Sequence, residues 1–270
     1  MTETANPRYI ASLPMYNVTP ELAMLWQDFL ADVLRAARVE AQIVEPGDDL
    51  YTFWREPALL LSQTCGYPLT HGLAGQVQLV ATPSFDAPGC VDSDYSSVLL
   101  TRDATRFNSP DSWRGARVAF NQDDSNSGMN VLRHTIARHA QPDSPFFSEV
   151  VRTGSHLGSM RALAENRADV TAIDCVTYAF VQDMLPGLAA QMTQTGYSAA
   201  SPGLPLIASR NVPVETVMAL RNALDVTLTD SPARAKRLRL TGFTTLTIDD
   251  YTRITALEEE ARAAGYAHLA

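Results

Sequence analysis

The 270-residue sequence predicts an α/β protein with two lobes, each a mainly parallel sheet flanked by helices. Short apolar runs alternate with amphipathic helical patterns, which is typical of parallel sheets. The pattern restarts near Arg102, and the chain from Leu204 onward holds too few predicted elements to form its own core. We therefore expect one lobe from residues 1–101 and 204–270, and a second from residues 102–203. Two hinge crossings, near 101–103 and 198–203, would border a cleft suited to a small ligand.

The first lobe begins with a predicted strand at residues 9–13 and a helix that ends near Ala37. Thr19 is a good N-cap for this helix, and Pro20 suits its first position. Further strands of this lobe are predicted at 41–44, 59–62, 77–81 and 96–101. Strands of the second lobe are predicted at 118–120, 150–152, 170–173 and 191–197. A strand at 204–209 and helices at 214–228, 232–239 and 249–264 complete the chain.

Composition argues against several classes of protein. The net charge is −9, and the basic residues within 234–239 are spaced as on a solvated helix, so nucleic acid is not expected as a partner. The longest apolar runs, such as residues 58–61, are too short to span a bilayer. Residues 1–8 lack the basic and apolar regions of an export signal. We expect a protein that works in the cytosol, or one whose leader lies outside this sequence.

The cysteines and the common nucleotide motifs point to no cofactor and no metal. Cys65, Cys90 and Cys175 form no zinc pattern and no disulfide framework, although their spacing leaves a bridge between Cys65 and Cys90 open. The sequence contains no phosphate loop and no Gly-x-Gly-x-x-Gly motif. The Gly-x-Ser-x-Gly elbow of serine hydrolases is also missing.

The segment from Asn121 to Gly128 lies between a predicted strand and a predicted helix. Ser125, Asn126 and Ser127 precede the glycine, where the first helical N–H groups lack acceptors and the helix dipole is positive. Such a turn binds an oxyanion through backbone donors, and Gly128 permits close approach of the backbone. The alternative is that Ser127 only caps the helix.

A second turn of this kind, Thr153–His156, follows the strand at 149–152. If the two strands are parallel neighbours, both turns open at one sheet edge. Ser155 and His156 are then candidate ligand contacts, with the imidazole a neutral donor because the helix end disfavours its protonation. The alternative is a structural histidine. Asp174 follows the strand at 170–173, and we expect it either to cap a helix, or to accept a hydrogen bond from a protonated oxyanion or meet an amine on the ligand.

The first lobe offers a matching polar turn after the strand at 59–62. Its candidate contacts are Thr64, Cys65, Gly66 and Tyr67. Cys65 is interpreted as a buried structural cysteine in preference to a nucleophile, because no histidine is placed beside it. Tyr95 and Tyr16 are further candidates to line the same cleft, and a packing role for Tyr16 is the alternative.

Three of these segments resemble substrate-binding proteins of ABC transporters for phosphate, phosphite and phosphonate. Ser125-Asn126-Ser127-Gly128 resembles the Ser-Thr-Ser-Gly turn of that family; the turn Gly154-Ser155-His156 and the segment 168–174 also agree. The resemblance implies a type II periplasmic-binding-protein fold that closes on an oxyanion. It implies that Ser125, Asn126, Ser127 and His156 hold the phosphoryl oxygens and that Tyr95 contributes from the other lobe. Leu204 stands where aminophosphonate binders of the family carry an acidic residue.

These observations favour a non-enzymatic binding protein for a small oxyanion, namely phosphate, phosphite or a simple phosphonate. An ABC transporter permease is its expected partner, and the resemblance implies the periplasm. The alternative is a cytosolic enzyme of the same fold, with His156, Asp174 and Cys65 as acid, base and nucleophile. A cytosolic sensor that reports ligand binding to a partner protein is a third possibility.

Overall fold

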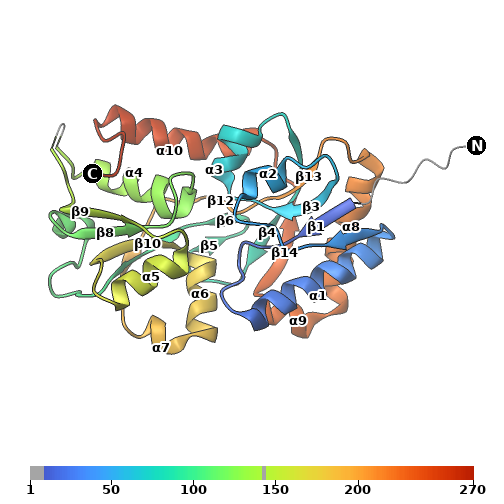
Figure 1. Cartoon of the computed structure of the whole chain (residues 1–270), viewed down its shortest axis with the longest axis horizontal. Coiled ribbons are helices and arrows are strands. Elements are labelled where there is room, and N and C mark those ends of the chain that lie inside the picture. The colour runs from blue at the N-terminus through green and yellow to red at the C-terminus, as the bar shows by residue number, and fades with distance from the viewer. Residues whose placement is uncertain (1–8, 142–143) are drawn as a thin grey trace, which may run out of the picture. The chain divides into compact units, whose positions relative to one another are not determined.

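The computed structural model describes residues 9–141 and 144–270, so residues 1–8, on which the interpretation of the export signal depended, lie outside the described residues. The chain divides into two compact units, each with its own sheet (Figure 1). Unit 1 comprises the described residues up to Asp86 together with Gly203–Asp250. Unit 2 comprises Ala87–Pro202 and Tyr251–Ala270.

Unit 1 contains a six-stranded sheet in the order β14-β4-β13-β3-β1-β2. Its strands are β1 Tyr9–Ser12, β2 Ala41–Ile43, β3 Leu59–Gln63, β4 Val77–Phe85, β13 Leu206–Ser209 and β14 Leu240–Thr244. β1 pairs in parallel with β2 and β3, whereas β13 runs antiparallel to β3 and β4. β14 is antiparallel to β4. The returning chain thus inserts a reversed strand into the centre of the sheet.

The long helix α1, Pro20–Ala37, illustrates how the sequence builds unit 1. The Thr19 hydroxyl accepts a hydrogen bond from Leu22 N at 3.2 Å, and Pro20 occupies the first helical position. Six apolar residues of α1 recur at helical spacing and are buried, namely Leu22, Trp26, Phe29, Leu30, Val33 and Leu34. α1 packs against α8, Val214–Asp230. The other helices of this unit are α2 Leu50–Trp54, α3 Gly66–Pro68, the π-helix Leu69–Leu73 and α9 Pro232–Arg237.

Unit 2 contains a five-stranded sheet in the order β11-β7-β10-β8-β9. Its strands are β7 Ser97–Thr101, β8 Arg117–Phe120, β9 Glu149–Arg152, β10 Val170–Asp174 and β11 Thr193–Tyr197. β8 pairs in parallel with β9 and β10, whereas β7 runs antiparallel to β10 and β11. A small sheet in the order β12-β6-β5 is formed by β5 Cys90–Val91, β6 Asp94–Tyr95 and β12 Ser201–Pro202.

Helices cover the sheet of unit 2 and enclose its core. They are the 3-10 helix Pro110–Trp113, the π-helix Asn126–Asn130, α4 Val131–Ala137, α5 His156–Ala164, α6 Cys175–Met184, α7 Pro186–Ala189 and, after the 3-10 turn Asp249–Tyr251, α10 Thr252–Ala263. Trp113, Leu132 and Ile136 are fully buried in one cluster with Ala261 of α10. α10 packs against α4 (Figure 1).

The unit boundaries differ from the predicted lobes in two places. Residues 87–101, expected in the first lobe, belong to unit 2 because β7 pairs along its length with β10. Residues 251–270 also belong to unit 2, since Asn130 Nδ2 donates to Ile254 O at 3.0 Å and Arg133 Nη1 donates to Ala267 O at 2.8 Å. The α/β class is confirmed, but both sheets are mixed where mainly parallel sheets were expected.

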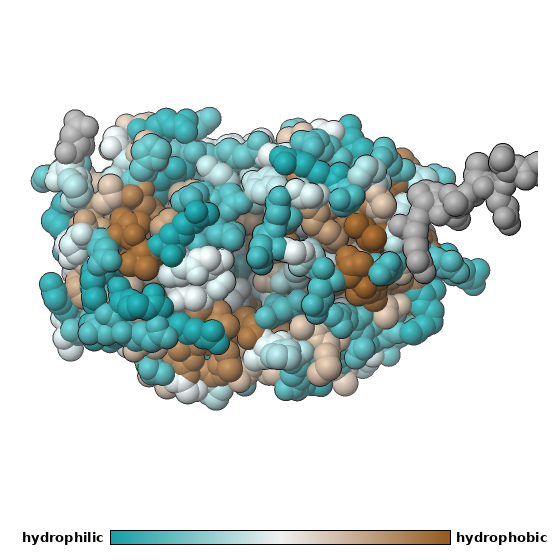
Figure 2. All heavy atoms as spheres, in the orientation of Figure 1, coloured by the Kyte–Doolittle hydropathy of each residue, from teal (hydrophilic) through white to brown (hydrophobic). Residues whose placement is uncertain are grey.

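None of the three cysteines forms a disulfide in this structure, so the Cys65–Cys90 bridge that the sequence left open is not observed. Cys65 lies in unit 1, whereas Cys90 lies in unit 2 with its Sγ 3.4 Å from Cys175 Sγ. Among the described residues, no helix has both the length and the hydrophobicity needed to cross a membrane. The face visible in Figure 2 is mostly hydrophilic, with hydrophobic residues in separate patches.

Candidate functional site

The two predicted turns lie side by side because their strands are parallel neighbours. Phe120, the last residue of β8, is in register with Arg152, the last residue of β9. Beyond this pair, Thr153 N donates to Phe120 O and Gly154 N donates to Asn121 O, both at 2.9 Å. The backbone itself therefore joins the turn after β8 to the turn after β9. The expectation that the two strands are parallel neighbours is confirmed.

Each turn is closed by the same serine cap. Ser125 Oγ accepts from Gly128 N at 3.0 Å, and Ser155 Oγ accepts from Gly158 N at 2.9 Å. Each serine precedes its helix in extended backbone conformation, as an N-cap residue does. Capping thus belongs to Ser125 and not to Ser127, the residue for which a capping role was the alternative. The Ser127 side chain, which does not cap the helix, is therefore available for a different contact.

Ser127 and His156 connect the two turns through their side chains. Ser127 Oγ lies 2.8 Å from His156 Nε2, and the Ser127 carbonyl accepts from Ser97 Oγ at 2.8 Å. Burial of the imidazole lowers the pKa of His156 to about 4, so the ring is neutral at pH 7. Within the described residues, the buried His156 Nδ1 and Asn121 Oδ1 both lack a hydrogen-bond partner. Two unsatisfied polar atoms therefore lie in neighbouring turns.

Gly128 is required by the close packing between these turns. A Cβ atom at this position would lie 1.9 Å from Asn121 Oδ1 and 3.2 Å from His156 Cε1. Any side chain here would displace the Asn121 amide and press on the His156 ring. The glycine thus permits the first turn to approach the second, a role different from the close approach to a ligand that the sequence predicted.

The Asn126 side chain forms hydrogen bonds with other residues of unit 2. It is fully buried, and its Nδ2 donates to Tyr95 Oη at 3.1 Å and to Ser201 Oγ at 2.8 Å. Its Oδ1 accepts from Asn130 Nδ2 at 3.0 Å. Because both protons of the Asn126 amide are donated to protein oxygens, this side chain fixes Tyr95 of β6 against the first turn. Asn126 and Tyr95 are therefore brought together within unit 2.

Asp174 caps the helix that follows its strand. Its Oδ1 accepts from Val176 N at 2.7 Å and from Thr177 N at 3.0 Å, which is the capping role that the sequence left as one alternative. Asp174 is also the register partner of Ser97, the residue that binds the Ser127 carbonyl. The carboxylate thus lies at the sheet edge that carries the first turn.

The acidic residues of the first turn have different environments. Asp123 forms an exposed ion pair with Arg152, with Oδ2 and Nη1 3.3 Å apart. Burial raises the pKa of Asp124 above its usual value. The Ser127 hydroxyl and the His156 ring, which join the two turns, are both uncharged at pH 7.

Of the candidate residues of the first lobe, Tyr16, Thr64, Cys65, Gly66 and Tyr67 lie in unit 1. Tyr95, which was expected to contribute from the other lobe, lies instead in unit 2 with the two turns. Cys65 precedes α3, which begins at Gly66, and Thr64 N donates to Pro205 O at 3.0 Å. Tyr67 stacks on His71 with ring centroids 3.8 Å apart. Tyr16 is buried and packs against Phe85 at 5.3 Å, so the packing role proposed as its alternative is observed.

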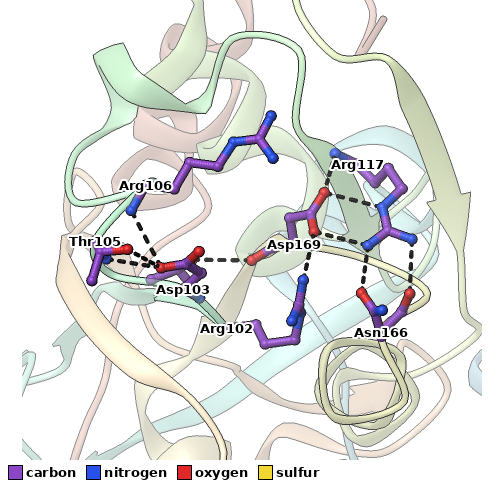
Figure 3. A network of polar contacts seen from close by, with 8 residues as sticks. Arg102, Asp103, Thr105, Arg106, Arg117, Asn166 and Asp169 are labelled. Carbon is purple, nitrogen blue, oxygen red and sulfur yellow. Dashed lines mark hydrogen bonds and ion pairs between the residues drawn. The ribbon is translucent and has the colours of Figure 1, made fainter.

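A polar network fixes the opposite ends of the strands that carry the turns (Figure 3). Asp169, which precedes β10, accepts from Arg117 Nε at 3.0 Å and from Arg117 Nη2 at 2.8 Å. Arg102 Nη2 adds a bond of 3.3 Å, and Arg117 also donates to the Asn166 carbonyl at 2.7 Å. The hydrogen bonds from Arg117 lower the pKa of Asp169 to about 2. The network holds the start of β8 beside the start of β10.

Three residues of the site were not predicted. Asn121 directly follows β8, and its position beside the turn was the only signal that pointed to it. Ser97 and Ser201 carried no signal, because Ser201 lies 75 residues from Asn126 along the chain. Only the pairing of β7 with β10 and of β6 with β12 brings these serines to the first turn.

Solved structures with this fold include several binding proteins of ABC transporters. A binding-protein component of a phosphonate transporter from Pseudomonas aeruginosa has 16% identity and a TM-score of 0.76, covering 96% of this chain and 87% of that chain. PhnD1 from Prochlorococcus marinus, solved with methylphosphonate, has 12% identity and a TM-score of 0.76, covering 95% and 99%. The alkanesulfonate-binding protein SsuA from Xanthomonas axonopodis pv. citri, solved with MOPS, has 14% identity and a TM-score of 0.67, covering 96% and 93%.

Identities this low relate the chain to these structures by fold alone, and no curated protein matches it by sequence. The profile of one protein family, however, matches residues 48–251, which is most of the chain and includes both turns. The protein therefore belongs to the family of periplasmic substrate-binding proteins of phosphonate ABC transporters.

Proposed function

We propose that this protein captures a small oxyanion, namely phosphate, phosphite or a simple phosphonate, at the paired turns of unit 2. The observation that carries the proposal is the contact of 2.8 Å between Ser127 Oγ and His156 Nε2, which joins two helix N-terminal turns. His156 Nδ1 is buried without a partner among the described residues and adds unused hydrogen-bonding capacity beside this contact. Asn121 Oδ1 also lacks a partner among them, but it is an acceptor and suits only an oxyanion that carries a proton.

The chemistry of the site suits an anion bound by uncharged donors. The chain continues as helix after Ser125 and again after Ser155, so the first N–H groups of both helices and the positive ends of their dipoles lie at one sheet edge. Ser127 Oγ and His156 Nε2 share one hydrogen bond, so this pair leaves one side-chain donor for the anion: the Ser127 hydroxyl when Nε2 carries the ring proton, or Nδ1–H when Ser127 donates to Nε2. Hydrogen bonds to an ionised acceptor are about twice as strong as bonds between neutral groups.

Asn126 and Asp174 help to form this site. Asn126 holds the Tyr95 hydroxyl at 3.1 Å and so places Tyr95 beside the first turn, where its ring would contact the ligand. Asp174 caps α6 at the same sheet edge. A carboxylate near the anion would favour a ligand that carries a proton over one, such as sulfate, that carries none.

Membership of the family supports a role in uptake without chemical conversion of the ligand. We propose that the protein delivers the intact oxyanion to an ABC transporter permease. The methylphosphonate complex of PhnD1 makes this compound a suitable first ligand to test. A ligand that binds only the folded chain raises its melting temperature by mass action.

Calorimetric titration and thermal shift with phosphate, phosphite, methylphosphonate, sulfate and acetate test the proposal. We expect heat and a rise in melting temperature with at least one phosphorus oxyanion, and an unchanged ligand by phosphorus NMR. Ser127→Ala and His156→Ala should each weaken binding at least tenfold. The matched controls are Ser148→Ala and His268→Ala, both at exposed positions of unit 2. The absence of binding to every phosphorus oxyanion, or equal losses in site and control variants, would contradict the proposal.

A further inference from the structure

Two cysteines of unit 2 face each other although they are distant in sequence. Cys90 Sγ lies 3.4 Å from Cys175 Sγ, and 85 residues separate the two positions. Cys90 begins β5 and is partly exposed, whereas Cys175 begins α6 and is buried. Both sulfurs are free thiols in this structure.

Backbone hydrogen bonds to Ser96 hold the segments that carry both cysteines. Cys175 N donates to Ser96 O at 3.1 Å, and Ser96 N donates to Gly89 O at 2.9 Å. Gly89, which has a φ of 102°, is required here because a Cβ at this position would lie 3.1 Å from Cys175 Cβ and 2.8 Å from the Tyr197 ring. The segment before β5 therefore rests directly on the start of α6, and the two thiols are held in register.

We propose that Cys90 and Cys175 form a disulfide that ties the β5–β6 hairpin to the N-terminus of α6. Cys90 is the cross-strand partner of Tyr95, and Cys175 follows Asp174 directly. The bond would join the strand pair that carries Tyr95 to the end of β10. This inference rests on the contact between the thiols and does not depend on the proposed function.

The reaction is thiol–disulfide exchange with a small external disulfide, RSSR, such as glutathione disulfide. The Cys90 thiolate attacks one sulfur of RSSR, the S–S bond of RSSR breaks, and RS⁻ leaves and takes up a proton as RSH. Cys175 then loses its proton and attacks Cys90 Sγ, and the second RSH leaves. The two protein thiols are oxidised to one disulfide, and RSSR is reduced to two RSH.

The environments of the two thiols determine the order of these steps. Its contact with Cys90 and its burial raise the pKa of Cys175, so this thiol is almost entirely protonated at neutral pH. Cys90 is the more accessible sulfur and makes the first attack. The adjacent Cys175 then resolves the mixed disulfide by an intramolecular step.

Thiol counting on the full chain tests the inference. After incubation with excess glutathione disulfide, titration of the denatured protein should find one free thiol in place of three. Peptide mapping should recover a single cross-link between Cys90 and Cys175, two hydrogens lighter than the reduced pair. In Cys65→Ser the count should fall from two to zero. The oxidised wild type should melt about 5 °C or more above the reduced form, and dithiothreitol should abolish the difference.

Two single variants distinguish the thiol that attacks first, Cys90, from the thiol that resolves the mixed disulfide, Cys175. Cys175→Ser should stop at a glutathione adduct on Cys90, and Cys90→Ser should form an adduct at least about tenfold more slowly because only buried thiols remain. Neither variant should show the rise in melting temperature on oxidation. Three thiols that survive oxidation, a cross-link that contains Cys65, or a Cys90→Ser variant that reacts as fast as Cys175→Ser would overturn the inference.

Discussion

The Ser127 hydroxyl oxygen lies 2.8 Å from His156 Nε2, so one side-chain contact joins turns that follow two neighbouring parallel strands. The other ring nitrogen, Nδ1, is buried and has no partner in the part of the chain that the structure describes. A protonated ring would therefore bury an N–H donor that nothing accepts. Burial of the ring lowers the pKa of His156 to about 4.

We predict that His156 makes the stability of the protein depend on pH between 6.5 and 4. Its pKa is about 4 in the folded state and 6.5 when unfolded, so only the unfolded chain takes up a proton in this range. The contribution is complete above pH 6.5 and is lost as the pH falls to 4. Between pH 7 and 4, the wild type should lose about 2 kcal/mol more unfolding free energy than His156→Gln.

Urea unfolding followed by circular dichroism at pH 7, 6, 5 and 4 measures this difference. His268→Gln, at an exposed position of the same unit, is the control and should follow the wild type. If the stability of the wild type and that of His156→Gln fall in parallel with pH, His156 does not titrate as described.

We predict that Gly128→Ala destabilises the protein by about 1–3 kcal/mol, because the added methyl group would lie 1.9 Å from Asn121 Oδ1. Removing the Asn121 amide should restore part of the unfolding free energy that Gly128→Ala loses. In an Asn121→Ala background, Gly128→Ala should lower the unfolding free energy by at least about 0.5 kcal/mol less than it does in the wild type. Coupling energies between residues in contact begin at about this value. Equilibrium unfolding of the two single variants and the double variant gives the coupling.

Gly187→Ala is the matched control for this prediction. A Cβ at Gly187 of α7 has no heavy atom within 4 Å, so its effect on unfolding free energy should stay within about 0.5 kcal/mol. Additive effects of the substitutions at 128 and 121 would show that the predicted clash is not the source of the cost.

We predict that Asp169→Asn lowers the unfolding free energy by about 2 kcal/mol at pH 7. The Asp169 carboxylate accepts two bonds from the Arg117 side chain, and its pKa falls from 3.8 to about 2. A carboxyl group with a lowered folded-state pKa stabilises the fold above pH 3.8, and this contribution is lost as the pH falls through 2. The difference between wild type and variant should therefore shrink toward pH 2.

Urea titrations at pH 7, 4, 3 and 2 test this dependence. Asp28→Asn, at an exposed position of α1, should change the unfolding free energy by less than about 0.5 kcal/mol. An Asp169→Asn deficit that is the same at pH 7 and pH 2 would mean that the lost stability comes from packing and not from charge.

Local chemistry made much of the fold and part of the site predictable. The apolar runs of β8, β9 and β10 and the cap of α1 by Thr19 depend on neighbours a few residues away. The same holds for the turns, since Ser125 and Ser155 cap glycines three residues later in the chain. The identity of the capping residue was missed in the first turn because three polar residues there are chemically able to cap.

The unit boundary shows where local patterns are insufficient. The strand at Ser97–Thr101 and the helix Thr252–Ala263 were both predicted as elements, but their unit was assigned wrongly. An amphipathic helix indicates that it must bury one face, not which surface it will cover. Asn130 and Arg133, which bind the C-terminal segment, hold carbonyls 124 and 134 residues away.

The sequence by itself determined most of the strands and helices in their order, although not β14 or the short strands β5, β6 and β12. It also determined the polar turns that follow β8 and β9, because these depend on backbone geometry and on hydrogen bonds within a few residues. Only the tertiary structure decided that Ser127 meets His156, that Asn126 holds Tyr95 and Ser201, and that Cys90 faces Cys175. Those contacts depend on strand register and on the burial of polar atoms, which are properties of the whole packed unit and not of any short segment.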